Sequence, residues 1–274
     1  MDEKNPQQLR ILLIGDIVGK PGRDIVRKLL PTVRQHYELD LVVANAENAA
    51  GGSGLTPQNY KELLATGIDG ITLGDHIYRR REIYTVLEAQ ANIVKPANFP
   101  PEAPGRPWMT LTTASGHAVA VISVLGRVFM RPVDCPLAAV DRVLGELPDN
   151  QHAIIVDYHA EATSDMQVMG RYLDGRVSAV LGTHTHVATA DEQIFPGGTA
   201  FQCDVGMTGP FASILGRRID RVLETTKSFR PMPFDVASSD VRLQGTIVEV
   251  DPQTGKAQAI CRISLAGCDT SNWP

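Results

Sequence analysis

Polar side chains stand at the ends of five short apolar runs in this sequence. The runs cover residues 10–16, 39–45, 71–76, 153–159 and 177–184. They are aliphatic and rich in β-branched residues, which is typical of strands buried on both faces. The polar residues in them or just after them are Asp16, Glu47, Asn48, Asp75, His76, His159, His184 and His186. Because ligands of open α/β sheets gather beyond the carboxyl ends of the strands, we expect these side chains to share one crevice.

Carboxylate, amide and imidazole groups in one crevice form the donor set of a divalent metal centre. His184 and His186 flank Thr185, so in an extended segment their side chains would lie on one side and contact one ion together or one ion each. A lone histidine is more often structural, but four of the seven histidines end an apolar run. The row as a whole therefore predicts a dinuclear metal site.

Two of these motifs admit plainer interpretations. Asp16 could cap a helix that begins near Asp24, and taken alone this interpretation is favoured. The glycine-rich residues 45–54 could cradle a phosphate group, but the Lys-Ser/Thr pair of a Walker motif is missing. The strand-end motifs contain no Ser-His-Asp or Cys-His arrangement that would indicate a nucleophilic enzyme.

The elements that position these residues alternate between strand and helix in the first two-thirds of the chain. Apolar residues recur at three- and four-residue spacing in residues 24–34, 58–66 and 81–89, which predicts helices packed on a sheet. Further strands are expected at residues 117–126, 198–204, 245–251 and 257–264, with a hairpin turn at 251–256. We therefore predict the α/β fold class, with two sheets and outer helices, as a single domain over residues 1–274.

Two segments lack a regular period. Residues 97–108 are rich in proline, which removes a backbone donor and fixes φ, so they are predicted to form an irregular loop. Residues 205–240 are predicted to form either a flap over the site or a disordered or packing loop. Met207, Thr208 and the loop around Asn98 are candidates for substrate contacts, and equally for loop packing.

Charge and composition restrict the partners. The net charge is −5, the pI is near 5.8, and no basic block extends beyond Arg79-Arg80-Arg81, so a small anionic substrate fits better than an extended nucleic acid. These arginines and Lys95 are expected on solvated surfaces, with phosphate steering as the minority interpretation. No apolar run reaches the ~18 residues of a membrane span, and the polar N-terminus is unlike a signal peptide, which predicts a cytoplasmic protein. The four cysteines form no CxxC pair, so we expect them to be reduced and mostly buried.

Five sequence blocks together carry a resemblance to a known family. They are Gly15-Asp-Ile-Val-Gly-Lys-Pro-Gly-Arg23, Asn45-Ala-Glu-Asn-Ala-Ala-Gly-Gly52, Asp157-Tyr-His-Ala-Glu-Ala-Thr-Ser164, Gly182-Thr-His-Thr-His-Val187 and Asp204-Val-Gly-Met-Thr-Gly-Pro210. The chain resembles the calcineurin-like metallophosphoesterases over residues 11–265, and more narrowly their bacterial YmdB-like branch of cyclic-nucleotide phosphodiesterases. The resemblance implies a four-layer α/β/β/α sandwich of two mixed sheets, two divalent ions, iron or manganese, and phosphodiester substrates such as 2′,3′-cyclic AMP.

Carried over residue by residue, the resemblance implies two overlapping ligand sets. The first ion would be held by Asp16, Glu47, Asn48 and His186. The second would be held by Glu47, Asp75, His159 and His184, so that Glu47 bridges the pair. His76 would protonate the leaving ribose oxygen, while the metals lower the pKa of a shared water to give hydroxide near neutral pH.

One position departs from the family pattern. The family usually has asparagine in its Gly-x-His motif, whereas this chain has Asp75. The additional negative charge should hold metal more tightly, but it should also raise the pKa of the bridging water and repel the phosphate. We expect the substitution Asp75→Asn to keep or improve turnover.

The preferred function is a metal-dependent phosphodiesterase for small phosphodiesters. The alternatives are a phosphomonoesterase or nuclease on the same scaffold, and a non-enzymatic metal-binding regulator. A nuclease needs a basic groove, which the acidic composition does not indicate. A purely structural metal site does not need a proton donor such as His76, which favours catalysis. Assembly into a homo-oligomer is compatible with the resemblance.

Overall fold

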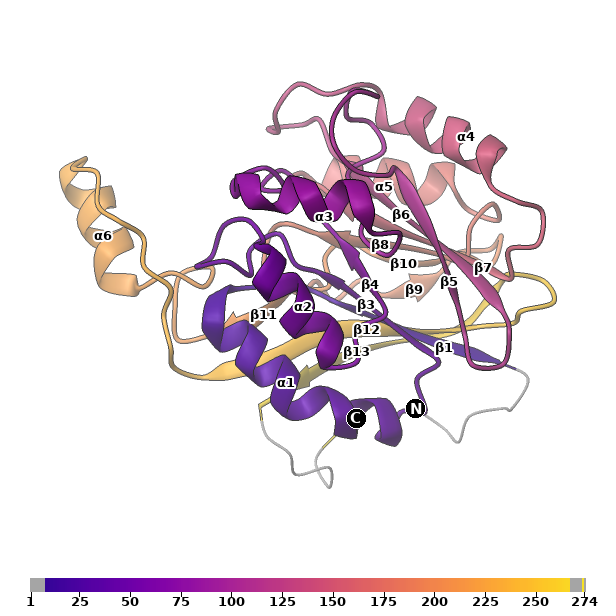
Figure 1. The fold of residues 1–274 in the computed structure, drawn as a ribbon, viewed down its shortest axis with the longest axis horizontal. Coiled ribbons are helices and arrows are strands. Elements are labelled where there is room, and N and C mark those ends of the chain that lie inside the picture. Colours follow the sequence, from indigo (N-terminus) through magenta and orange to yellow (C-terminus); the bar gives the residue numbers. More distant parts are fainter. Residues whose placement is uncertain (1–7, 267–272, 274) are drawn as a thin grey trace.

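Two mixed β-sheets form the centre of the molecule (Figure 1). The structure is a computed structural model, and it describes residues 8–266 and residue 273. The first sheet has seven strands in the order β2-β11-β12-β1-β3-β4, with β13 paired to β12. Its strands are β1 (Leu9–Ile14), β2 (Asp16–Ile17), β3 (Leu41–Asn45), β4 (Gly70–Thr72), β11 (Met207–Pro210), β12 (Val241–Val250) and β13 (Ala257–Leu265). β1, β3 and β4 are parallel, so their carboxyl ends lie at one edge.

The second sheet has six strands in the order β5-β6-β7-β8-β10-β9. These strands are β5 (Trp108–Thr112), β6 (Ala118–Leu125), β7 (Ala153–His159), β8 (Ala179–Thr183), β9 (Gln193–Ile194) and β10 (Ala200–Gln202). β6, β7, β8 and β10 run parallel, and the two outer strands are antiparallel to their neighbours. Each sheet therefore contributes a block of parallel strands with a common carboxyl edge.

The helices lie outside the sheets, apart from one that projects from them. They are α1 (Gly19–His36), α2 (Pro57–Ala65), the 3-10 turn η1 (Arg81–Ile83) with α3 (Tyr84–Ala89), α4 (Pro136–Glu146), α5 (Thr163–Tyr172) and α6 (Ile219–Ser228). Buried residues of α1, α2 and α3 share a core with the first sheet, and those of α4 and α5 share a core with the second. α6 extends away from both sheets at the left of Figure 1.

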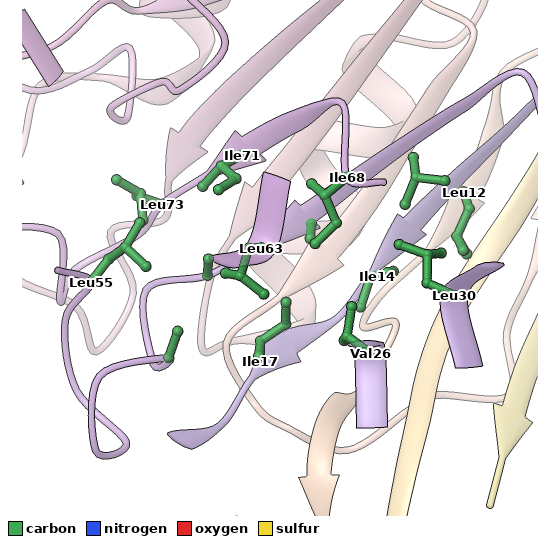
Figure 2. Packing of buried hydrophobic residues seen from close by; sticks show 14 of the residues in the cluster. Leu12, Ile14, Ile17, Val26, Leu30, Leu55, Leu63, Ile68, Ile71 and Leu73 are labelled. Atoms are coloured by element: carbon green, nitrogen blue, oxygen red, sulfur yellow. The ribbon is translucent and has the colours of Figure 1, made fainter. Parts of the chain in front are cut away.

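Three core clusters correspond to the three interfaces between the four layers. Along β1, Leu12 and Ile14 pack with helical residues such as Val26 and Leu30, as Figure 2 shows. The alternate residues Ile11 and Leu13 belong to a second cluster with residues of β6, β7 and β8, which lies between the sheets. Because successive side chains of a strand point to opposite faces, a strand with apolar partners on both faces must be apolar throughout. The predicted four-layer α/β/β/α sandwich is confirmed.

α1 begins earlier than its sequence pattern indicates. Its first residue is Gly19, five positions before Asp24, and its N-cap residue Val18 makes no side-chain capping bond. Asp16 therefore does not cap this helix. Gly22 lies where an added Cβ would meet the carbonyl oxygen of Thr208, so the first turn of α1 can lie directly against β11 only with glycine there.

Several expectations about individual segments are corrected by the structure. Lys95, expected on a solvated surface, is only 3% exposed, and its ammonium group donates to the backbone oxygens of Pro100, Pro101 and Ala103. These bonds fix the irregular proline-rich loop. Burial lowers the pKa of Lys95. The arginines 79–81 are exposed, as expected.

The cysteines also differ in part from expectation. All three cysteines that the structure describes are free, but only Cys203 is buried; Cys135 is exposed and Cys261 is intermediate, while Cys268 lies outside the described residues. The prediction that the cysteines are buried is therefore wrong for Cys135 and Cys261. None of the helices in the described part of the chain combines the length and apolar character that a bilayer crossing requires.

Residues 205–240 contain regular structure that the sequence pattern does not indicate. β11 pairs with β2 and β12, and α6 is a regular helix in which no residue is buried. Two residues between them, Leu215 and Arg217, line the cavity described below. Residues 205–240 thus border the site, but α6 does not pack over it.

Candidate metal centre

The predicted site residues meet where the carboxyl ends of the two sheets face each other. Asp16 lies in β2 directly after β1, and Glu47 and Asn48 follow β3. Asp75 and His76 follow β4, His159 ends β7, and His184 and His186 follow β8. Most of them line one cavity of about 270 Å³. Its lining residues are Glu47, Asn48, Gly52, His76, Glu161, His184, Thr185, His186, Leu215 and Arg217.

A deep group of four residues has the spacing of a single metal site. Glu47, Asp75, His159 and His184 each offer one ligand atom, and these atoms all lie within 4.8 Å of one another. His159 Nε2 is 3.1 Å from Glu47 Oε1 and 3.4 Å from Asp75 Oδ1. His184 Nδ1 is 3.1 Å from His159 Nε2. Two carboxylates and two imidazoles can therefore meet one cation here.

A second group, formed by Asp16, Asn48 and His186, lies on the other side of Glu47. Asn48 Nδ2 is 3.1 Å from Asp16 Oδ1 and 3.3 Å from His186 Nε2. The same amide nitrogen is 3.5 Å from Glu47 Oε1, so Glu47 contacts both groups. This arrangement is what a shared carboxylate between two neighbouring ions requires.

The charges of the site leave a place for cations. Asp16 and Glu47 are fully buried. In the described residues their ion-pair partners are histidines only, and no lysine or arginine pairs with either carboxylate. Burying a carboxylate without a positive partner is costly, so the donor set fits divalent ions well.

The histidine and carboxylate charges in the deep group shift each other. Burial by itself lowers the pKa of His159, but the charge of Glu47 and the hydrogen bond to Asp75 outweigh burial and raise this pKa well above its usual value. Burial raises the pKa of Asp75, but its hydrogen bond to His159 outweighs burial, and the net pKa is lowered. A proton on His159 thus occupies the position between carboxylates that a metal ion would take.

A buried chain of hydrogen bonds orients His159. Its Nδ1 lies 2.8 Å from Thr183 Oγ1, which donates to Asp157 Oδ1 at 2.7 Å. Asp157 also accepts a bond from Asn45 Nδ2 at 3.2 Å. Burial raises the pKa of Asp157. With Nδ1 fixed on the hydroxyl group, Nε2 remains for the ligand position, as in metal sites where an outer partner sets the histidine tautomer.

The loop after β8 differs from its sequence-based expectation. His184 and His186 were expected in an extended segment, but they have positive φ angles of 108° and 64°. Asp204 Oδ2 accepts bonds from Thr185 N and Thr185 Oγ1, both at 2.8 Å, and Asp16 Oδ2 accepts one from His184 N at 3.0 Å. Buried carboxylates therefore hold a strained turn that sends the two imidazoles to different groups.

His76 is attached to the same residues but remains accessible. Its backbone N–H donates to Glu47 Oε2 at 2.9 Å, and its Nδ1 lies 2.8 Å from Asn48 Oδ1. Its side chain is 27% exposed, and Nε2 has only Asp75 Oδ2, at 3.8 Å, as an ion-pair partner among the described residues. This is the geometry of a group that can exchange a proton with a bound molecule.

Some residues of the site were not identified from the sequence, and some candidates do not belong to it. Asp157, Thr183 and Asp204 were not singled out, although a buried polar residue inside an apolar run was a usable signal. Asn98 is bonded to Leu125 and to the Asp134 carbonyl instead of facing the cavity.

Met207 and Thr208 are buried in β11, and Thr208 Oγ1 donates to Gln244 O. Substrate contact and loop packing were the two interpretations of these residues and of Asn98. Packing is the correct one.

Comparison with known proteins identifies the family of the chain. A family model described as YmdB-like protein matches residues 12–263. The 2′,3′-cyclic-nucleotide 2′-phosphodiesterase of Bacillus subtilis (strain 168) is 44% identical over 257 residues, which is 94% of this chain and 97% of that protein. A hypothetical protein from Thermus thermophilus has a TM-score of 0.88 at 41% identity, covering 93% of this chain and 98% of that one. A novel phosphatase from Mycoplasma pneumoniae has a TM-score of 0.88 at 29% identity, covering 94% of this chain and 93% of that one. The chain belongs to the YmdB-like family.

Proposed function

We propose that this protein is a metal-dependent phosphodiesterase that hydrolyses small phosphodiesters such as 2′,3′-cyclic nucleotides. The main support is the deep group, in which four ligand atoms lie within 4.8 Å of one another, together with the buried carboxylates of Asp16 and Glu47, which pair with no lysine or arginine among the described residues. The relative from Bacillus subtilis is named for this activity. The small cavity fits a mononucleotide better than a polymer.

The residues divide into two proposed ligand sets. Asp16, Asn48 and His186 would hold one ion, Asp75, His159 and His184 would hold the other, and Glu47 would contact both. Mixed oxygen and nitrogen donors suit iron or manganese. When bound, the ions supply Lewis-acid chemistry, because they lower the pKa of a water molecule and neutralise charge on the phosphoryl oxygens.

Asn48 links this centre to His76. Asn48 Oδ1 lies 2.8 Å from His76 Nδ1, so the amide oxygen accepts a hydrogen bond from a protonated Nδ1. The second proton of the charged ring is then on Nε2. Nε2 would give this proton to the departing ribose oxygen, which leaves a neutral ring with its hydrogen on Nδ1.

Two further aspects of the proposal follow from composition and sequence. The acidic charge and the small cavity favour a small diester over a nucleic acid, so a nuclease is the weaker alternative. A cytoplasmic location and assembly into a homo-oligomer remain predictions.

The test is hydrolysis of 2′,3′-cyclic AMP and of bis-p-nitrophenyl phosphate by manganese-loaded protein, beside the variant His76→Ala and an elemental analysis of both. We expect diesterase activity that falls about 10²- to 10⁴-fold in the variant while the metal content is retained. Bound metal without turnover of either substrate by the wild-type protein would contradict the proposal and favour a regulator.

A further inference from the structure

Arg217 is a fixed positive charge in a cavity that otherwise offers acidic and histidine groups. Among the described residues that line this cavity, it is the one lysine or arginine. It comes from residues 205–240, outside every motif to which a catalytic role was assigned. The same short stretch contacts a proposed metal ligand, because His186 Nδ1 lies 3.2 Å from Leu215 O.

The guanidinium of Arg217 is held by backbone carbonyl groups. Nη1 donates to Gly51 O at 3.2 Å and to Phe234 O at 2.9 Å, and Nη2 donates to Gly52 O. In the described part of the chain, no carboxylate forms an ion pair with it. Arginine has five N–H donors, so these three bonds leave donors and a full positive charge for a ligand.

The glycine-rich loop is shaped around this guanidinium. Gly52 has φ +87°, and a Cβ added there would collide with the Arg217 guanidinium carbon and both terminal nitrogens. Only glycine therefore allows the guanidinium to lie against the loop. The loop follows Glu47 and Asn48, so the same few residues place two proposed metal ligands and the arginine around one cavity.

We propose that Arg217 binds the phosphate group of the substrate and of the product. A phosphodiester carries one negative charge and its hydrolysis product carries up to two, and a planar guanidinium matches phosphate oxygens in geometry and charge. This inference rests on the proposed phosphodiesterase function and adds a binding residue to it.

The experiment compares Arg217→Met and Arg217→Gln with Arg80→Met in manganese-loaded protein. Arg80 is a matched control, because its Nη2 donates to Ala50 O of the same loop at 3.2 Å while the residue does not line the cavity. The readouts are kcat and KM for 2′,3′-cyclic AMP, the affinity for inorganic phosphate by calorimetry, and the melting temperature.

We expect both Arg217 variants to raise KM and to weaken phosphate binding by about 10- to 100-fold, as for the loss of a charge-assisted bond. Arg80→Met should stay within about 2-fold, since it removes a neutral-acceptor contact away from the ligand. Arg217→Gln keeps amide donors for the loop carbonyls, so a purely structural role would be rescued by it.

Three outcomes would overturn the proposal. They are a wild-type phosphate affinity in Arg217→Met, recovery of both KM and phosphate affinity in Arg217→Gln, and an equal loss in Arg80→Met. Phosphate binding decides the role of Arg217 even where neither diester is hydrolysed. If the wild-type protein hydrolyses the diesters and KM is unchanged in the Arg217 variants, the phosphodiesterase function is retained. Only the role of Arg217 in phosphate binding is then excluded.

Discussion

The cavity has two walls of different construction. The wall made by the strand ends includes Glu47 and is backed by Asp16 and His159; all three are fully buried, and hydrogen bonds within the sandwich fix them. The wall made by residues 205–240 carries Arg217, which is held by backbone carbonyls of Gly51, Gly52 and Phe234, and leads into α6, in which no residue is buried. The proposed reaction chemistry therefore lies on the buried core, while proposed substrate recognition lies on the stretch between the buried strand β11 and the exposed helix α6.

The largest effect is expected on the buried wall, at Glu47. The substitution Glu47→Ala removes a carboxylate that contacts both ligand groups, and activity should fall about 10³-fold or more as several kcal/mol of metal-derived stabilisation is lost. Activity and elemental analysis measure the change, and circular dichroism serves as the control for folding. A variant that keeps a full complement of metal and wild-type kcat would show that Glu47 does not bridge the groups.

The hydroxyl group behind His159 is expected to have a smaller effect. Thr183→Val leaves His159 Nδ1 without its partner, and the affinity for the second ion should weaken about 10- to 100-fold, as for other outer partners of metal ligands. Manganese titration by calorimetry measures this change. Thr183→Ser keeps the hydroxyl group and should restore the affinity; equal losses in the two variants would point to packing instead.

Asp75 lies at the edge of the buried wall, where its side chain is partly exposed. Asp75→Asn removes one negative charge from the site, and turnover should be kept or improved by up to about 10-fold, because the metals then attract the anionic substrate more strongly. Steady-state kinetics and metal analysis of the purified variant test this expectation. Complete loss of metal with no gain in rate would count against it.

The smallest effect is expected on the exposed wall. Leu223 in α6 is 45% exposed, so Leu223→Ala should change the free energy of unfolding by no more than about 0.5 kcal/mol. Leu29 in α1 is fully buried and provides the matched control, since Leu29→Ala should cost about 2–5 kcal/mol. Urea denaturation of the two variants measures both values. A large loss in Leu223→Ala would mean that α6 packs against something in solution.

The buried wall was predictable from the sequence, and the other wall was not. A strand with a core on both faces must be apolar, so runs such as Ala153–His159 stand out, and so does the polar residue that ends each run. No residue of α6 is buried, so packing against a core does not impose a spacing of apolar residues on its sequence. The position of Arg217 depends on contacts with distant residues, such as Gly52.

Other errors have the same physical origin. Lys95 is a charged residue whose burial depends on three carbonyl groups of a proline-rich loop, and no local pattern indicates such bonds. The positive φ angles of His184 and His186 depend on Asp204, which accepts bonds from Thr185 and lies two strands further along the chain, after β10. Residue types at strand ends thus predict which groups gather, while long-range hydrogen bonds determine how each one is turned.

The strand-end residues are proposed to hold two ions, and elemental analysis of the purified, manganese-loaded chain measures this number. We expect two metal ions per chain in the wild-type protein and a loss of both in Glu47→Ala. A metal-free wild-type chain, or an unchanged metal content in the variant, would contradict it.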